Sequence, residues 1–317
     1  MDIYLASLHT LTHFKNGEKM MDIYLAGTHS RPYVIEGALK SDIYLAGAAT
    51  GGNIPKEIKR KVFEGENMDL YLAGTMYGNQ SKTVDALKIP TNQRLFILES
   101  FFYADEFTEK YIPKFSKFML DSGAFTFMQA RKNHSVNWDD YIERYADFIN
   151  RNKVDLFFEL DIDSIVGIKE VERLRNRLER LTCKQSIPVW HKSRGKDYYL
   201  WICNEYPYVA LGGLLPEMRR EMEKYFPWFI DQAHKRGAKI HGLGFTDLKG
   251  LPKYHFDSVD STAWTTGNRF GYAYIFTGKT MIKKKRLPNE RMVNTQQLAL
   301  HNFNEWVKFQ RYAEKHL

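Results

Sequence analysis

Short apolar runs alternate with amphipathic segments along the chain from residue 68 onward. In residues 136–152, hydrophobic side chains recur every three to four positions, from Trp138 through Tyr145 to Ile149, which is the spacing of one helix face. The other predicted helices are Lys169–Leu181, Lys196–Glu205 and Glu217–Arg236. The predicted buried strands are Met68–Ala73, Arg94–Glu99, Lys117–Leu120, Leu156–Leu160, Ile187–Trp190, Tyr208–Leu211, Lys239–His241 and Phe256–Val259.

This alternation predicts an α/β protein of the (β/α)8 TIM-barrel type over residues 68–278. Parallel strands joined by crossover helices are what a closed barrel needs. A doubly wound sheet is the alternative, and it would need a glycine-rich phosphate-binding turn after an early strand. The sequence contains neither a G-x-G-x-x-G nor a Walker sequence, so we favour the barrel.

Both ends of the chain depart from the barrel pattern. A repeated β-prone motif predicts an N-terminal extension with short strands over residues 1–67. The copies of this motif are Asp2–Ser7, Asp22–Gly27, Asp42–Gly47 and Asp69–Gly74, the last of which supplies the first predicted barrel strand. Residues 279–317 are predicted to form a basic segment and an amphipathic helix, Asn294–Leu317, that packs on the barrel. The same helix is a candidate contact for a homodimer.

Composition narrows the classes of protein. The 317 residues carry a formal net charge of +8, which favours an acidic partner such as nucleic acid. Because the only cysteines are Cys183 and Cys203, the chain cannot build a disulfide framework, an iron–sulfur cluster or a cysteine-rich zinc site. No apolar run reaches the ~18 residues of a membrane span, and no signal peptide is visible. We therefore expect a cytoplasmic protein.

Acidic residues, a histidine and glycine pairs follow the predicted strands where each strand ends. Because the carboxyl ends of barrel strands meet at one edge, we expect these residues to surround a single opening. Carboxylates around one opening bind a metal, or divide into a nucleophile and a general acid/base. Glycine pairs admit a flat ligand close to the backbone, which favours a nucleobase. The residues are Asp121, Asp161, Asp163, His191, Gly212, Gly213, Gly242, Gly244, Asp257 and Asp260.

Five motifs within residues 94–275 stand in an order that is similar to that of a known family. They are Asp121-Ser122-Gly123-Ala124-Phe125, Phe158-Glu159-Leu160-Asp161, Gly212-Gly213-Leu214, Gly242-Leu243-Gly244-Phe245-Thr246 and Phe256-Asp257-Ser258-Val259. With them the chain resembles the tRNA-guanine transglycosylases, and more closely their DNA-modifying relatives of phages and bacteria, which insert 7-deazaguanine bases. Ala124 departs from the family's second glycine. The resemblance implies a barrel enzyme in the cytosol of a bacterium or a phage-infected host.

The resemblance implies base exchange at a nucleoside, without a cofactor or a metal. A carboxylate attacks the sugar C1′, guanine leaves, and a 7-deazaguanine base takes its place. Asp121 then recognises the base edge and acts as the general acid/base. The nucleophile is Asp257, which matches the motif, or Asp260, which lies at the strand exit and which we favour; strand alternation puts the two on opposite faces. The incoming base is bound by Asp161, which is in the family position, or by Asp163. His191 stands at the position of a glutamine that contacts the base in the family, and the alternative is that it is a structural histidine. The other residues of the implied base site are Ser122, Gly123, Phe125, Gly212, Gly213, Leu214, Gly242 and Gly244.

Departures from the family change the expected substrate. The tRNA enzymes carry a Cys₃His zinc site and a Pro-Thr-Arg sequence after the nucleophile, and this chain has neither. DNA is therefore favoured over tRNA. The basic strip Lys279–Arg291, which includes Lys283, Lys284, Lys285 and Arg286, contacts backbone phosphates or is a solvated surface segment. The polar stretch Thr262–Gly271 predicts a loop in which Arg269 grips the substrate.

Two other functions stay open on the sequence. One is a metal-dependent or acid–base barrel hydrolase that uses Asp121, Asp161, Asp163 and His191, and whose metal-dependent form would lose activity with a chelator. The other is a non-catalytic nucleic-acid-binding barrel, which would bind DNA in a salt-sensitive way and release no guanine.

Overall fold

The computed structural model describes residues 23–25, 32–35, 43–46, 68–75, 94–129, 136–213, 221–245, 247–285 and 295–317. The chain divides into two compact units, Met1–Gly65 and Glu66–Leu317. In the first unit, β1 (Ile23–Leu25), β2 (Pro32–Ile35) and β3 (Ile43–Ala46) form a sheet in the order β1-β3-β2. Two copies of the repeated motif pair in parallel there, since Ile23 lies opposite Ile43. The first copy, residues 2–7, lies outside the described residues.

The second unit is built on a parallel sheet of eight strands. In chain order they are β4 (Asp69–Ala73), β5 (Phe96–Ser100), β6 (Lys117–Asp121), β7 (Leu156–Phe157), β8 (Val189–Trp190), β9 (Tyr208–Leu211), β10 (Lys239–Gly242) and β11 (Ser258–Ser261). Each strand pairs with the next along the chain except β7 with β8, and β11 pairs with β4. A parallel bridge between Phe158 and Ile187 joins β7 to β8. The strands therefore close on themselves, which confirms the predicted (β/α)8 barrel.

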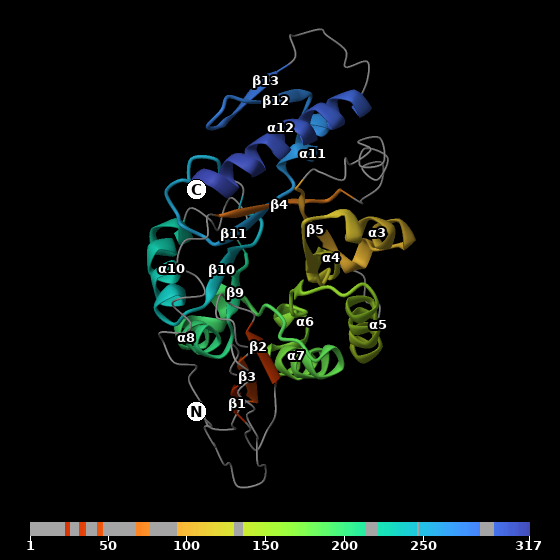
Figure 1. Cartoon of the computed structure of the whole chain (residues 1–317), viewed down its shortest axis with the longest axis vertical. Helices are drawn as coiled ribbons and strands as arrows, with labels where there is room; N and C mark the ends of the chain where they lie inside the picture. The colour runs from red at the N-terminus through yellow and green to blue at the C-terminus, as the bar shows by residue number, and fades with distance from the viewer. Residues whose placement is uncertain are drawn as a thin grey trace, which may run out of the picture. The chain divides into compact units, whose positions relative to one another are not determined.

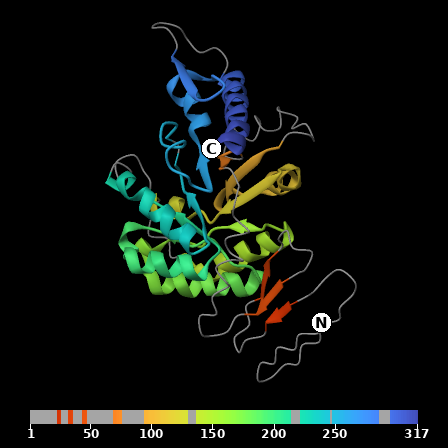
Figure 2. The same ribbon diagram turned by 60° about the vertical axis from the view of Figure 1, so that its left-hand side comes forward.

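Helices follow the strands and cover the outside of the barrel (Figures 1 and 2). The α-helices are α3 (Glu106–Tyr111), α4 (Ala124–Gln129), α5 (Trp138–Arg151), α6 (Asp163–Val166), α7 (Ile168–Thr182), α8 (Gly195–Glu205) and α10 (Phe226–Lys235). The 3₁₀ turns are η1 (Phe101–Tyr103), η2 (Ile112–Lys114), η3 (Lys192–Arg194) and η4 (Glu223–Tyr225). Helix α5 begins where the side chain of Asn137 accepts a hydrogen bond from the Asp140 amide, as its polar first turn favours. None of the helices in the described part of the chain is both long and apolar enough to cross a membrane.

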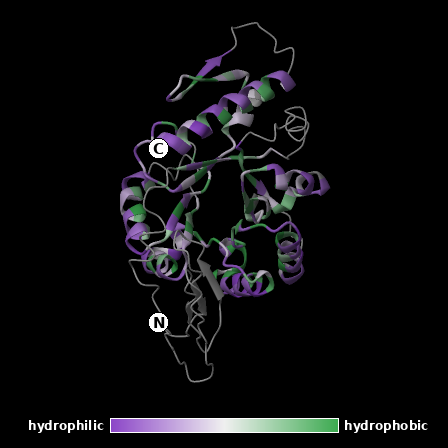
Figure 3. Cartoon of the chain, in the orientation of Figure 1, coloured by the Kyte–Doolittle hydropathy of each residue, from purple (hydrophilic) through white to green (hydrophobic). Residues whose placement is uncertain are grey.

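Strand side chains alternate between the barrel interior and the surrounding helices. Tyr71, Phe96 and Met119 belong to the cluster inside the barrel, whereas Leu72 and Ile97 belong to the larger core under the helices. Figure 3 shows hydrophobic residues on the strands and hydrophilic residues on the outer helix faces. This alternation fixes which residues at the strand ends point toward the barrel axis.

A C-terminal layer covers the β4 side of the barrel. It consists of α11 (Ala263–Phe270), β12 (Tyr272–Phe276), β13 (Met281–Lys285) and α12 (Thr295–His316). Helix α12 lies between β4 and the β12–β13 hairpin (Figure 1). The predicted loop at residues 262–271 is wrong, because residues 263–270 form α11. A Cβ on Gly267 would lie 2.0 Å from Asn302 Nδ2, so this glycine serves the close packing of α11 on α12.

The basic strip lies partly on the hairpin. Lys283, Lys284 and Lys285 are exposed on β13, and Lys283 Nζ lies 4.8 Å from the centroid of the Tyr272 ring. Arg286 and the side chain of Arg269 are outside the described residues. The hairpin thus presents a row of lysines to solvent, and their contact with phosphates stays a prediction.

Gln310 on α12 links β4 and β5 below the point where the two strands pair directly. Its Nε2 donates to the carbonyl oxygens of Leu70 (2.7 Å) and Phe96 (2.8 Å), and its Oε1 accepts from the Phe96 amide (3.2 Å). Gln310→Leu is expected to lower the free energy of unfolding by about 2–4 kcal/mol, because buried backbone groups lose their partners. Urea denaturation measures this. Gln296 is exposed on the same helix, so Gln296→Leu should change the free energy of unfolding by less than ~0.5 kcal/mol. Equal losses in the two variants would contradict the role assigned to Gln310.

Candidate active site

Three carboxyl groups lie at the carboxyl edge of the barrel. Asp121 is the last residue of β6, Asp161 follows β7, and Asp260 lies near the end of β11. Burial, followed by the charge of Asp161 and by that of Asp260, raises the pKa of Asp121 to about 7. The backbone amide of Gly123 acts in the opposite direction. The structure therefore brings together three acids from the ends of three different strands, and one of them, Asp121, has a pKa near neutral pH.

A tight turn fixes Asp121. The Gly123 amide donates to Asp121 Oδ2 at 2.9 Å, and Gly123 has a φ of +85°, which favours glycine. A Cβ at this position would lie 2.6 Å from Phe102 Cβ and 3.1 Å from Tyr141 Oη. Tyr141 in turn donates to the Ser122 carbonyl at 2.6 Å. Gly123 is thus required by local geometry, and Ser122, whose backbone carbonyl accepts the bond from Tyr141, is fully buried.

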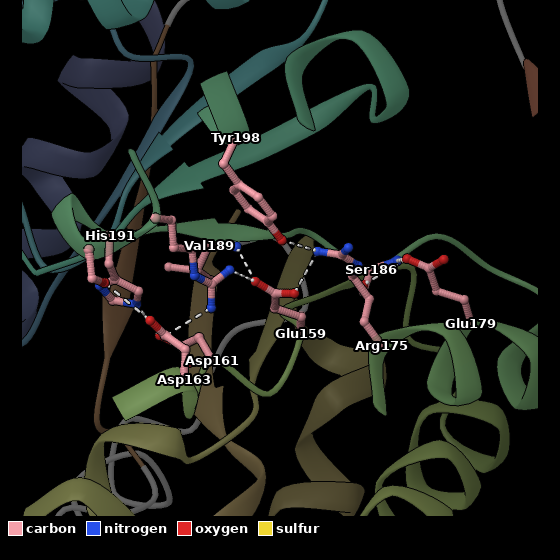
Figure 4. Close-up of polar contacts among 11 residues, drawn as sticks. Glu159, Asp161, Asp163, Arg175, Glu179, Ser186, Val189, His191 and Tyr198 are labelled. Carbon is pink, nitrogen blue, oxygen red and sulfur yellow. Dashed lines mark hydrogen bonds and ion pairs between the residues drawn. The ribbon is translucent and has the colours of Figure 1, made fainter. Parts of the chain in front are cut away.

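Asp161 forms a hydrogen-bonded pair with His191, which follows β8 (Figure 4). His191 Nε2 lies 2.8 Å from Asp161 Oδ2. Burial raises the pKa of Asp161, and the hydrogen bond from His191 partly offsets this shift. The pair needs a glycine at position 212, since a Cβ there would lie 2.4 Å from His191 Cε1 and 2.7 Å from Val189 Cγ1. The positions of Asp161, His191 and Gly212 after their strands predict that the three residues share the carboxyl edge of the barrel, and the structure places them there.

Gly212→Ala is expected to displace the His191 ring and to break its contact with Asp161, because the added methyl group overlaps the imidazole. The free energy of unfolding should fall by about 1–3 kcal/mol. The loss of the His191–Asp161 contact is measured from the His191 imidazole signals in NMR spectra. Spectra of Asp161→Asn, which lacks the carboxylate, serve as the reference. Gly242→Ala is the matched control, because its Cβ meets no atom closer than Phe245 Cβ at 3.1 Å. Unchanged His191 signals in Gly212→Ala would refute this role.

Asp260 is held by two hydrogen bonds inside the barrel. Its Oδ1 lies 3.2 Å from His241 Nε2 and accepts from the Gly244 amide. His241 is fully buried, and its Nδ1 contacts Ser258 Oγ, which also contacts the Tyr208 hydroxyl. All three contacts are satisfied when Tyr208 donates to Ser258, Ser258 donates to Nδ1, and Nε2–H donates to Asp260. This orients one carboxylate oxygen and leaves Oδ2 for another partner.

Sequence reasoning missed this chain of Tyr208, Ser258 and His241. The signal that finds it is alternation: His241 and Ser258 lie opposite each other in the register of β10 and β11, and Asp260 comes two residues after Ser258 on the same face. An analysis restricted to the residue at each strand exit omits the inward-facing residue two positions before it, such as Ser258 before Asp260.

Asp163 lies beside the cluster and is held by a cation (Figure 4). Its Oδ1 accepts from Arg194 Nη2 at 3.0 Å, and its Oδ2 accepts from Ser193 Oγ at 3.1 Å. Burial alone would raise the pKa of Asp163, but the charge of Arg194 and its hydrogen bond outweigh this effect, so the pKa is lowered. Arg194 and Arg175 both also bind the buried Glu159. This network joins the loop after β7 to the loop after β8, and so it sets the positions of Asp161 and His191.

Asp257 lies away from the cluster. It precedes β11, and its Oδ2 accepts hydrogen bonds from the Ile240 amide at 2.7 Å and contacts His234 Nε2 at 2.9 Å. His234 belongs to α10 outside the barrel, and Ile240 lies near the start of β10. Since Asp257 and Asp260 are three residues apart, they point to opposite faces, and only Asp260 points inward. Asp257, the direct motif match, is therefore a structural carboxylate at the amino end of the barrel.

The other predicted base-site residues follow the strand ends. Gly213 and Gly244 have positive φ values of 68° and 70°, and Gly242 ends β10. Phe125 is half-exposed on α4, and Leu214 lies outside the described residues. Among the residues that the structure describes, no three histidine, cysteine, aspartate or glutamate side chains are arranged to hold a metal ion.

No family model and no curated protein matches the sequence. Among solved structures, the chain is similar to a protein assigned as a fructose-1,6-biphosphate aldolase from Coccidioides immitis, at 10% identity and a TM-score of 0.46 over 84% of this chain and 95% of that one. It is also similar to the carboxyl transferase domain of Rhizobium etli pyruvate carboxylase, at 12% identity and a TM-score of 0.41 over 83% of this chain. The chain spans about half the length of the latter, 51%.

Proposed function

We propose that this protein exchanges guanine for a 7-deazaguanine base in nucleic acid, with DNA favoured over tRNA, through a covalent intermediate between Asp260 and the sugar. One observation carries the proposal: a carboxyl group with a pKa near 7, Asp121, shares the barrel opening with a carboxylate that is fixed by N–H donors, Asp260. Glycosyl transfer with retention uses this division between a proton-bearing acid and an oriented nucleophile. The ordered motifs that resemble the transglycosylases support the same assignment.

The reaction has two steps. Asp260 Oδ2 attacks C1′ and forms a C–O bond while the C1′–N9 bond breaks, and the electron pair of that bond goes to guanine. Protonated Asp121 gives its proton to the leaving base. In the second step, the Asp121 carboxylate takes a proton from the ring nitrogen of the 7-deazaguanine. That nitrogen attacks C1′, and the bond to Asp260 breaks and returns a carboxylate.

The remaining edge residues bind and orient the base. The Asp161 carboxylate, held by His191, accepts hydrogen bonds from the amide and amino N–H groups of a guanine-like ring. Gly213, with its φ of 68°, carries no side chain that would keep the ring from the backbone, whereas Gly212 leaves room for the His191 imidazole. Arg194 and Glu159 support this part of the site from behind without reaching the opening, since both side chains are almost fully buried.

Incorporation of radiolabelled guanine into duplex DNA, single-stranded DNA and tRNA tests the proposal. We expect label in DNA and release of one unlabelled guanine for each base incorporated. Release of guanine without incorporation would favour a hydrolase, and salt-sensitive binding without release would favour the non-catalytic barrel. Host extract is added in a parallel reaction, so that a need for a partner protein is detected. Absence of label in every nucleic acid, with and without extract, would overturn the proposal.

A further inference from the structure

Exposed apolar side chains occur on the segments that follow three successive strands at the carboxyl edge. Phe102 and Tyr103 follow β5, Phe125 follows β6, and Ile165 follows β7, with exposed fractions of 42%, 39%, 50% and 47%. The other large exposed apolar side chains that the structure describes lie on separate elements: Leu181, Trp201, Tyr225, Phe270 and Ile282. Grouped exposed rings of this kind mark a binding surface more often than single exposed residues do.

The two rings after β5 are held in place beside Asp121. Ser100, the last residue of β5, lies opposite Asp121 in the strand register, and η1 begins at the next residue. The Phe102 ring makes edge-to-face contacts with Tyr103 at 5.0 Å and with Phe127 at 5.1 Å between centroids. The tight approach of Phe102 Cβ to Gly123 joins η1 to the turn that fixes Asp121. The exposed ring surfaces are therefore positioned before any ligand binds.

We infer that Phe102 and Tyr103 form a stacking surface for the unpaired bases that flank the exchanged nucleotide, which makes single-stranded or locally opened nucleic acid the bound form of the substrate. The inference rests on the proposed function, because a guanine inside a stacked duplex cannot reach Asp260 within a barrel opening. Removing a base from the stack exposes its neighbours, and aromatic side chains replace the lost stacking without regard to base identity. Phe125 belongs to the proposed base site, whereas Phe102 and Tyr103 follow the neighbouring strand, β5.

Binding of fluorescein-labelled oligonucleotides tests the inference. Anisotropy titrations at one salt concentration use a single-stranded DNA with one guanine, the RNA of the same sequence, and the duplex DNA. The wild-type protein should bind both single strands more tightly than the duplex. Phe102→Leu, which keeps an apolar side chain and removes the ring, and Tyr103→Ala should each weaken single-strand binding about tenfold. Circular dichroism checks that each variant is folded.

Leu181→Ala is the matched control. Leu181 is 43% exposed, close to the value for Phe102, but it lies at the end of α7 next to the amino edge of the barrel. The Leu181→Ala variant should bind every oligonucleotide with the affinity of the wild-type protein. Wild-type affinity in folded Phe102→Leu and Tyr103→Ala, or preference for duplex, overturns the inference even if base exchange is observed. Loss of affinity in both variants without any base exchange supports the stacking surface while the proposed function fails.

Discussion

Asp260→Asn is expected to lower the rate of base exchange by about 10³–10⁶-fold and to abolish the covalent intermediate, because the amide cannot form the bond to C1′. The structure supports a chemical rather than a structural loss. Asn keeps an oxygen that accepts from the Gly244 amide and from His241 Nε2, so the local contacts survive. Incorporation of labelled base under saturating substrate measures the loss, and thermal denaturation should show nearly wild-type stability.

Asp257→Asn is the matched control for this variant. Its carboxylate accepts from the Ile240 amide and contacts His234 at the other end of the barrel, so the change should cost about 1–2 kcal/mol of stability. The exchange rate should stay close to that of the wild-type protein. If Asp257→Asn lost exchange while Asp260→Asn kept it, the two residues would have to trade roles. Full exchange in both variants would remove the carboxylate mechanism.

Asp121→Asn is expected to lower the exchange rate by about 10²–10⁴-fold, the usual contribution of general acid–base catalysis. The pH dependence separates this role from simple binding. In the wild-type protein, a single turnover to the intermediate needs the proton on Asp121, whose pKa is about 7. Its rate should therefore fall roughly tenfold per pH unit above that value. The residual rate of Asp121→Asn should not show this decline, and a wild-type rate that rises or stays level between pH 7 and 9 would contradict the assignment.

The same group predicts a change in stability. The folded protein holds the Asp121 proton up to a pKa of about 7, whereas the unfolded chain releases it near 3.8. The folded state therefore binds more protons between these values, and stability falls as the pH rises through this window. Asp121→Asn removes the penalty, so at pH 8 it should be more stable than the wild-type protein by about 2 kcal/mol, and near pH 4 the difference should vanish. Urea denaturation at both pH values measures this.

Much of the fold follows from local pattern. The predicted strand Tyr208–Leu211 is the observed β9, and the other barrel strands lie within a few residues of their predicted bounds. Barrel strands are short apolar runs between amphipathic helices, so both periodicities are visible in the sequence. Convergence of Asp121, Asp161 and Asp260 was predictable as well, because the carboxyl ends of parallel strands meet at one edge.

What the pattern could not give depends on contacts between distant segments. The partner of Asp163 is Arg194, more than 30 residues later, and the link from Tyr208 to His241 depends on the register of three strands. Helix α11 resembles a loop in sequence because its Gly267 serves packing against Asn302 on α12. Strand β13, which pairs with β12 in a hairpin, lies in a segment whose lysines suggested only a basic strip.

The most direct test of the account is the mass of the protein after denaturation in the presence of a guanine-containing oligonucleotide and no incoming base. We predict a species equal in mass to the protein plus the oligonucleotide minus guanine, attached at Asp260 and absent in Asp260→Asn. A wild-type protein that releases guanine and never carries the oligonucleotide, or an attachment at any residue other than Asp260, would contradict it.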